Sequence, residues 1–240
     1  MAHETNPEST AAVIAKAAAG PARRPAESVS EQTYQALFQL ITSRQIEPGD
    51  VIEERRLAER FEVSRTPMRA AISRLLGEGV LQQLSNGVMV VREVGLTEYL
   101  ELLAIRLLLE SEAAGLAALR APLVVLAQIE SRLQTSLVLL ATQPDTDHRL
   151  DDDIHEVIVA HCGNQSLAKF ITEIHKRIRM RNLQSRPDRL IPACQEHLAL
   201  VHALQARDAL RARQAMVEHL ENVRNSYLRT AGILPTMAPT

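Results

Sequence analysis

The most constraining feature of this chain is a helical pattern that covers more than half of its length. From Thr97 to Ala231, apolar residues recur at intervals of three and four, the spacing that lines one face of an α-helix. Proline, Gly-Asn and aspartate interrupt the pattern at a few points. The spacing predicts helices over residues 97–120, 122–142, 147–162, 165–185, 191–206 and 208–231. Six such helices sharing one core make an all-α bundle.

The composition is consistent with a helical protein. Only six of the 240 residues are aromatic and none is tryptophan, so Leu, Ala, Ile and Val must build the core. This scarcity excludes an aromatic-rich β-sandwich and the recognition of single-stranded nucleic acid by base stacking. No apolar run approaches the ~20 residues of a membrane span, and the N-terminus lacks the apolar segment of a signal peptide. We therefore expect a cytoplasmic protein.

A second domain is expected before the bundle. Residues 1–27 lack periodicity and are rich in Ala, Pro, Ser, Thr and Glu, which is typical of a disordered tail. Order is expected from Ser28, the first residue of a capping-box pattern, and a helical stripe follows to about Arg44. Two short helices are predicted over residues 54–61 and 65–78. The β-prone runs 80–84 and 88–91 flank an Asn-Gly turn signal and predict a hairpin.

This order of elements predicts the fold class. Helix, helix-turn-helix and hairpin follow one another as in a winged helix-turn-helix domain, which we place at residues 28–95. The all-helical domain is placed at residues 96–232, followed by a frayed tail at 233–240. The chain is thus expected to be mainly α, with a small β-hairpin as its only sheet.

The basic residues are concentrated in the predicted helix-turn-helix. The chain carries a net charge of −2, yet residues 55–74 contain six arginines against two acidic residues, a local balance of +4. In the helix that begins at Arg65, apolar residues mark the inward face, so Ser64, Thr66 and Arg69 share the outward surface with Arg65. These side chains suit phosphates and guanine edges in a major groove. A solvated arginine face without a ligand is the alternative.

Histidines in the helical half form a candidate metal site. Asp151 and His155 lie four residues apart on one predicted helix, while His197 and His219 each follow a glutamate on two later helices. One carboxylate and three imidazoles suit Zn, Mn, Ni or Fe and leave coordination positions open. From spacing alone, a hydrogen-bonded Asp–His pair at the surface is the commoner arrangement.

The N-terminal half resembles a known family of regulators. The run Leu57–Ala71, which reads LAERFEVSRTPMRAA, with Pro48-Gly49 before it and Asn86-Gly87 after it, is similar to the DNA-binding signature of the GntR superfamily. Glu62 departs from that signature, which commonly has Gly there. The residues to which the resemblance assigns DNA contacts are Arg55, Ser64, Arg65, Thr66, Arg69 and Gly87.

The helical half resembles the FCD effector domain of the FadR-like subgroup. Leu150-Asp151-x3-His155, Glu196-His197 and Glu218-His219-Leu220 are similar to its metal-binding pattern. The resemblance implies a divalent metal ion, zinc first and nickel, manganese or iron as alternatives. Its ligands would be Asp151, His155, His197 and His219, with Asp152 in place of Asp151 as an alternative. The histidines without a place in the pattern, expected to be ordinary surface or core residues, are His148, His161, His175 and His202.

Three arginines are candidates for contact with an effector. Arg106 resembles the arginine of the first FCD helix that faces the metal cavity, and a guanidinium opposite a cation suits a small carboxylate. An intrahelical pair with Glu110 is the alternative. Arg177 and Arg181, four residues apart on another predicted helix, are further candidates.

The sequence thus predicts a ligand-responsive transcription regulator rather than an enzyme. We expect a repressor that binds palindromic double-stranded operator DNA as a homodimer, leaves it when a small organic acid binds, and has no membrane partner. One alternative is a metal-dependent hydrolase that uses the Asp/His3 centre, although no HExxH motif or nucleophile elbow is present. Another is a purely structural metal in a protein without an effector.

Overall fold

The computed structural model describes residues 28–142, 150–181 and 187–234. It separates into two compact units. Of the described residues, the first unit contains those up to Val94 together with 176–181, and the second contains the others between Gly95 and His175 and those from 187 onward. The expected tail at residues 1–27 and most of the expected C-terminal tail lie outside the described residues.

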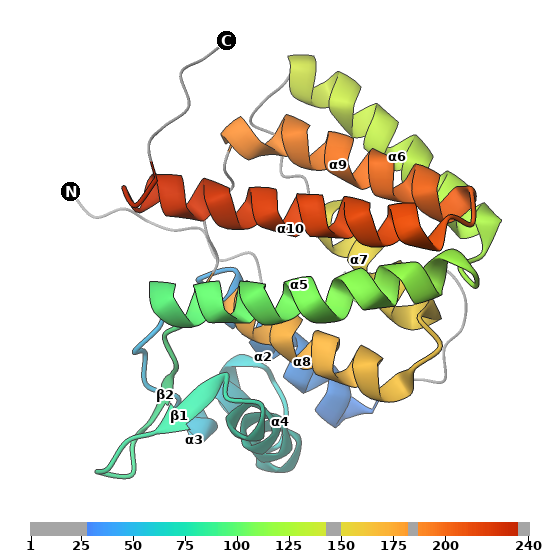
Figure 1. The fold of residues 1–240 in the computed structure, drawn as a ribbon. Helices are drawn as coiled ribbons and strands as arrows, with labels where there is room; N and C mark the ends of the chain where they lie inside the picture. Colours follow the sequence, from blue (N-terminus) through green and yellow to red (C-terminus); the bar gives the residue numbers. More distant parts are fainter. Residues whose placement is uncertain (1–27, 143–149, 182–186, 235–240) are drawn as a thin grey trace. The chain divides into compact units, whose positions relative to one another are not determined.

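The first unit has the elements of a winged helix-turn-helix (Figure 1). Its helices are α2 (Val29–Thr42), α3 (Glu54–Arg60) and α4 (Arg65–Gly77), followed by strands β1 (Leu81–Gln83) and β2 (Met89–Val91). The strands pair antiparallel, with Leu81 opposite Val91, as the hairpin prediction required. Ser28 caps α2, its hydroxyl accepting a hydrogen bond from the backbone N–H of Glu31 at 3.2 Å.

The predicted helical stripes form the core of this unit. Leu37 of α2 and Met68 and Leu75 of α4 are completely buried, and α2 packs along α4. Glu62, in the connector between α3 and α4, has a φ of +54°, in the left-handed region that favours glycine. This backbone conformation explains why a glycine suits the position in the family signature.

A polar cluster flanks the core of the first unit. The hydroxyl of Tyr34 and the ammonium of Lys176 each donate to Glu78, both at 2.6 Å, and Arg74 donates to the same carboxylate at 3.1 Å. Burial alone would raise the pKa of Glu78, but the hydrogen bonds from Lys176 and Tyr34 outweigh it and lower that pKa. Glu78 is therefore held as a carboxylate in the folded chain.

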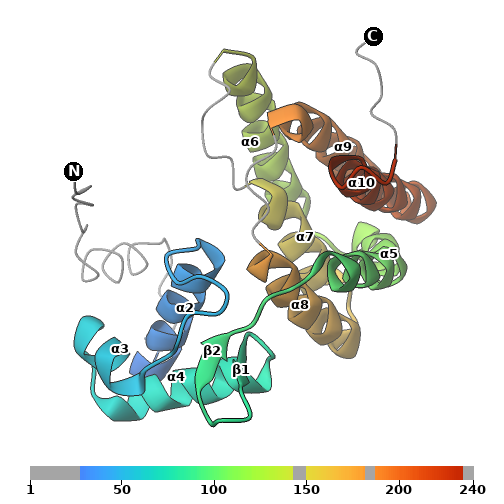
Figure 2. The same cartoon turned by 90° about the vertical axis from the view of Figure 1, so that its left-hand side faces the viewer.

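The second unit is a bundle of helices (Figure 1, Figure 2). Within it, α10 packs along α5 and α9, and α9 also packs against α6. A buried cluster rich in alanine, leucine and isoleucine holds the bundle together. Its helices are α5 (Leu96–Ala118), α6 (Leu123–Thr142), α7 (Leu150–His161), α9 (Pro187–Gln205) and α10 (Ala209–Thr230). Helix α8 (Gln165–Met180) belongs to the second unit up to His175 and to the first unit from Lys176 onward.

Two helix boundaries differ from the sequence prediction by four or more residues. Helix α8 ends at Met180, whereas the periodicity predicted a helix to residue 185, and residues 182–185 lie outside the described part. Helix α9 begins at Pro187, four residues before the predicted start at residue 191. A proline is tolerated at the first helical position because its missing N–H has no partner there in any case. Pro187 thus starts the helix.

Helix α6 is the described helix that comes nearest to a membrane span in length and composition. Its window Leu123–Leu140 has a mean hydropathy of 1.4 and is long and apolar enough to cross a bilayer by length and composition. Leu126, Ile129 and Leu133 of this helix are buried in the core of the bundle. The apolar character of α6 therefore contributes to the interior of the helical unit.

Candidate DNA-binding surface and metal centre

The N-terminal end of α4 presents the polar face that the sequence predicted. The side chains of Arg65 and Arg69 are 64% and 63% exposed, and Ser64 and Thr66 are exposed beside them. Ser64 occupies the N-cap position, but its hydroxyl makes no capping hydrogen bond. Because the apolar residues of α4 face inward, this end of the helix is left with hydrogen-bond donors directed to solvent.

Glu54, in the first turn of α3, joins the two arginines of this face. Arg65 Nε donates to Glu54 Oε1 at 2.9 Å. Arg69 Nε donates to Oε2 at 2.9 Å and its Nη2 to Oε1 at 3.0 Å. Hydrogen bonds from Arg69 and then Arg65 lower the pKa of Glu54. Sequence spacing does not reveal Glu54, because this residue lies just outside the arginine-rich stretch and on another helix.

Arg55 and Gly87 occupy the remaining predicted DNA-contact positions. The Arg55 side chain is 83% exposed, and its Nε lies 3.3 Å from Glu59 Oε1 on the same helix. An exposed pair of this kind is weak, so Arg55 remains available to a phosphate. Gly87 lies in the hairpin loop with a φ of +83°, and an added Cβ would meet no atom within 4 Å. The backbone conformation, rather than lack of space, favours glycine at this position.

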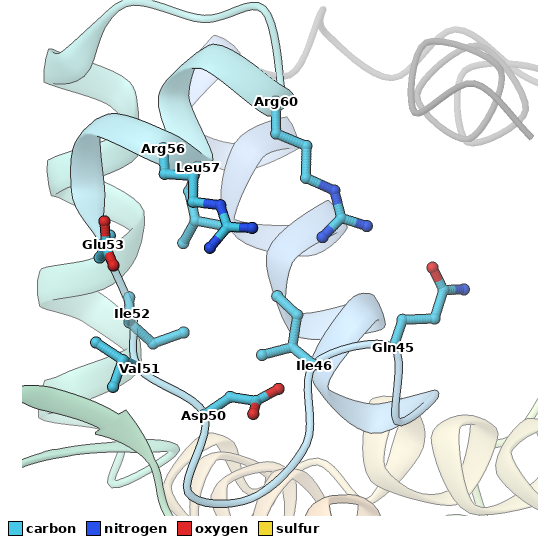
Figure 3. Close-up of a pocket in the computed structure, with 9 residues that line it drawn as sticks. All are labelled: Gln45, Ile46, Asp50, Val51, Ile52, Glu53, Arg56, Leu57 and Arg60. Atoms are coloured by element: carbon cyan, nitrogen blue, oxygen red, sulfur yellow. The ribbon is translucent and has the colours of Figure 1, made fainter. Parts of the chain in front are cut away.

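A hollow of about 660 Å³ lies beside α3 in the same unit. Figure 3 shows Arg56 and Arg60 projecting from α3 into it, with Asp50 at another edge. Ile46 and Ile52 contribute apolar surface to the lining. The described lining contains no histidine or cysteine, so this hollow is distinct from the metal centre that the sequence predicts.

Three of the four predicted metal ligands meet inside the second unit. His155 of α7, His197 of α9 and His219 of α10 are each at most 3% exposed. One ring nitrogen from each lies within 4.8 Å of the others, and His197 Nε2 is 3.3 Å from His219 Nε2. The side chains of Asp151 and of its alternative Asp152 lie outside the described residues. Three buried imidazoles from three helices thus place their nitrogen atoms close together, as the ligands of a transition-metal site do.

Two carboxylates orient the rings of this cluster. Glu110 Oε2 lies 2.6 Å from His155 Nδ1, and Glu196 Oε2 lies 2.9 Å from His219 Nδ1. Because an ionised carboxylate only accepts hydrogen bonds, we assign the proton of each ring to Nδ1, which leaves the lone pair on Nε2. Such carboxylate–histidine pairs accompany most histidines that bind metals.

Both carboxylates are ionised in the folded protein. Burial alone would raise the pKa of Glu110, but the charge of Arg106 and the hydrogen bond from His155 hold it well below its usual range. For Glu196, hydrogen bonds from Arg189 and His219 outweigh burial and lower the pKa to about 2. The assignment of both Nδ1 atoms as donors therefore holds at neutral pH.

Glu110 connects two further side chains to the cluster. It is completely buried and accepts hydrogen bonds from Arg106 and, at 2.7 Å, from His175 Nε2. The intrahelical alternative for Arg106 is therefore the arrangement in the structure. His175, expected to be an ordinary surface or core histidine, belongs with Glu110 and His155 to a second group of side chains that could hold a metal.

Comparison with known proteins identifies the family. Residues 29–93 match the family described as "Bacterial regulatory proteins, gntR family", and residues 101–222 match the "FCD domain". The chain belongs to the GntR family of regulators and carries an FCD domain. The resemblance seen in the sequence is thereby confirmed, as is the mainly helical fold class with its winged helix-turn-helix.

Relatives of this GntR-family regulator cover most of its length. It is 27% identical over 208 residues to the HTH-type transcriptional repressor RspR of Escherichia coli (strain K12), covering 84% of this chain and 90% of the relative. It is 31% identical over 230 residues to the Uxu operon regulator of Haemophilus influenzae, covering 84% of each. In fold it is similar to E. coli McbR/YncC, with a TM-score of 0.72, 23% identity and coverage of 85% and 99%.

These matches bear on the enzyme alternative. GntR-family proteins are DNA-binding transcription regulators and not enzymes, so the GntR-family regulator described here is not an enzyme. The hydrolase alternative has no support from any of the relatives.

The predicted effector arginines of this GntR-family regulator are found in different places. Arg106 lies in the second unit, with the histidines, and its charge is compensated by Glu110. Arg177 and Arg181 belong to the first unit, where Arg181 Nη1 donates to the carbonyl oxygen of Val94 at 2.9 Å. Their role in effector binding stays a prediction.

Proposed function

We propose that this GntR-family regulator represses transcription as a homodimer on a palindromic operator in the cytoplasm. A small organic acid would release it by binding at a divalent-metal centre in the FCD domain. The observation that carries the proposal is the cluster of three buried imidazoles, His155, His197 and His219, with one nitrogen of each within 4.8 Å of the others.

The DNA-binding half of the proposal is supported by the exposed donors of α4. Arg65 and Arg69 present their guanidinium groups at the end of the helix that enters a major groove in winged helix-turn-helix proteins. One such domain makes few base contacts, so two copies on two-fold-related half-sites are needed for tight specificity. Repression is the proposed sign because the relative RspR is named a repressor.

The residues of the cluster fit a divalent cation. Imidazole nitrogens are favoured ligands of zinc, and nickel, manganese or iron would also suit a site that Asp151 completes with a carboxylate. When bound, the cation would offer open coordination positions to an effector carboxylate. The chain itself contributes the orientation, because Glu110 and Glu196 hold the rings of His155 and His219.

The charges next to the histidine cluster bear on how a carboxylate effector would bind. Arg106 is paired with Glu110, so this arginine adds no uncompensated positive charge. A carboxylate effector would therefore depend on the metal for its main attraction, with Arg106 as a directional hydrogen-bond donor. Arg177 and Arg181 are secondary candidates for contact. Release from DNA requires that the effector bind the DNA-free conformation more tightly than the DNA-bound one.

The proposal is tested with an operator selected from a pool of random duplexes by the wild-type protein. Fluorescence anisotropy then measures operator affinity across a panel of small mono-, di- and tricarboxylic acids. We expect two chains per operator and at least one acid that weakens binding tenfold or more in the zinc-loaded protein only. The proposal would be contradicted if an acid weakened operator binding equally in the zinc-loaded and the chelator-stripped protein. A single chain per operator would also contradict it.

A matched pair of variants on α9 separates the metal role from general effects of substitution. His197→Ala removes a buried member of the cluster, whereas His202→Ala removes a histidine that is 48% exposed and contacts Glu130. We expect the first variant to bind operator but ignore every acid. The second is expected to respond as the wild type does.

A further inference from the structure

We propose that Glu54 is a positioning residue for DNA readout, which holds Arg65 and Arg69 in the orientation that reads guanine. The proposal rests on the proposed DNA contacts of these two arginines. It goes beyond them because it assigns sequence discrimination to an acidic residue that donates nothing to DNA.

The geometry separates the two edges of each guanidinium. Glu54 accepts from Nε of Arg65 and from Nε and Nη2 of Arg69, all at 2.9–3.0 Å. These bonds occupy the edge of each group that lies nearest to the helix. The terminal edge, formed by Nη1 and Nη2, still has one N–H on each nitrogen. That edge is the one that can pair with O6 and N7 of guanine.

The exposure of the three side chains fits this division. Glu54 is 25% exposed, whereas both arginine side chains are more than 60% exposed. The carboxylate thus lies beneath two guanidinium groups that extend into solvent. A long side chain that is already ordered loses less entropy when it binds, so the pairing favours contacts that need this one orientation.

The negative charge of Glu54 has a second and opposite effect. Close to the phosphate backbone it repels any DNA, whatever the sequence. Glu54 therefore strengthens binding to the operator through orientation and weakens binding to other DNA through charge. Both effects increase the ratio of operator affinity to non-operator affinity, which is the quantity that matters in a genome of competing sites.

The experiment compares Glu54→Gln with Glu53→Gln in the full-length chain. Glu53 is the neighbouring exposed acid and makes no capping hydrogen bond, whereas Arg65 and Arg69 donate to Glu54, so Glu53→Gln serves as the control for loss of charge. Affinities are measured by fluorescence anisotropy for the selected operator and for a scrambled duplex of equal length, at several salt concentrations. Thermal unfolding of each variant verifies that it is folded.

For Glu54→Gln we expect operator affinity to fall about tenfold, while affinity for the scrambled duplex rises roughly three- to tenfold. Glu53→Gln should raise both affinities slightly and leave their ratio unchanged. Replacing guanine with 7-deazaguanine in the operator removes the N7 acceptor. This change should reduce the operator affinity of the wild type more than that of Glu54→Gln.

Two results would overturn the proposal. If Glu54→Gln strengthens binding to both duplexes equally, Glu54 only competes with DNA for the arginines. If it weakens binding to both equally, with a lower unfolding temperature, its role is structural. Loss of operator binding in Arg65→Ala and Arg69→Ala tests the underlying DNA contacts separately.

Discussion

Replacing Glu110 with glutamine perturbs the orientation of the histidine cluster while nearly conserving volume. The carboxylate of Glu110 is completely buried and accepts from Arg106, His155 and His175. A glutamine amide keeps one acceptor oxygen but turns the other position into a donor, which then faces an N–H of one of these partners. Arg106, itself 8% exposed, loses its counter-charge.

The expected magnitudes follow from these contacts. Leaving one partner of a buried ion pair uncompensated costs about 3–5 kcal/mol, so the metal-free Glu110→Gln protein should be less stable to urea by that amount. Loss of a carboxylate behind a metal-binding histidine reduces metal affinity about 10–100-fold. At about 1.4 kcal/mol for each factor of ten, this corresponds to about 1.4–2.8 kcal/mol of binding free energy.

The assay is a competition for zinc between the protein and a chromophoric chelator, beside urea unfolding of the metal-free form. Glu112→Gln is the matched control on the same helix, because Glu112 is 51% exposed and pairs with Arg213 at the surface. We expect this control to lose less than about 1 kcal/mol and to bind zinc normally. A Glu110→Gln protein with wild-type zinc affinity would refute the role assigned to Glu110.

Three further predictions concern the first unit. Glu62→Gly should stabilise the protein by about 0.5–1 kcal/mol in urea unfolding, because φ at this position is +54°. The control Glu59→Gly lies within a helix and should destabilise the protein by about 1 kcal/mol, and destabilisation by both substitutions would refute the prediction. Because the pKa of Glu78 is lowered in the folded state, its contribution to stability is present above about pH 4.3 and is lost as the pH falls through the folded-state pKa. Glu78→Gln should therefore reduce the loss of unfolding free energy at acid pH. Parallel curves of unfolding free energy against pH for the variant and the wild type would disprove this. Arg65→Ala or Arg69→Ala should cost about 1–3 kcal/mol of base discrimination while the fold persists, and unchanged discrimination in gel-shift titrations would reject these residues as readers.

The fold was largely predictable because helices and hairpins depend on near neighbours in the chain. The periodicity of α4 and the Asn-Gly turn at Gly87 indicate elements that the structure contains. The predicted start of helix α9 is too late because a proline such as Pro187 interrupts a helical pattern, although it can equally start a helix.

The candidate site was only partly predictable. The family pattern pointed to His155 and its two partners on α9 and α10, which the structure brings together. Contacts between residues on different helices could not be predicted from sequence spacing. His175 and Glu110 are 65 residues apart, and Arg69 and Glu54 are 15 residues apart on different helices. Spacing reveals neighbours on one helix, whereas pairs of this kind depend on how helices pack.

The proposed metal centre is tested most directly by elemental analysis of tag-free protein purified without chelator. The wild type should contain about one divalent ion per chain, as a site of three imidazoles and one carboxylate would hold. His197→Ala and His219→Ala should contain almost none, and His202→Ala should match the wild type. A wild-type protein that is metal-free as purified, and that takes up no zinc, nickel, manganese or iron on dialysis, would contradict the proposal.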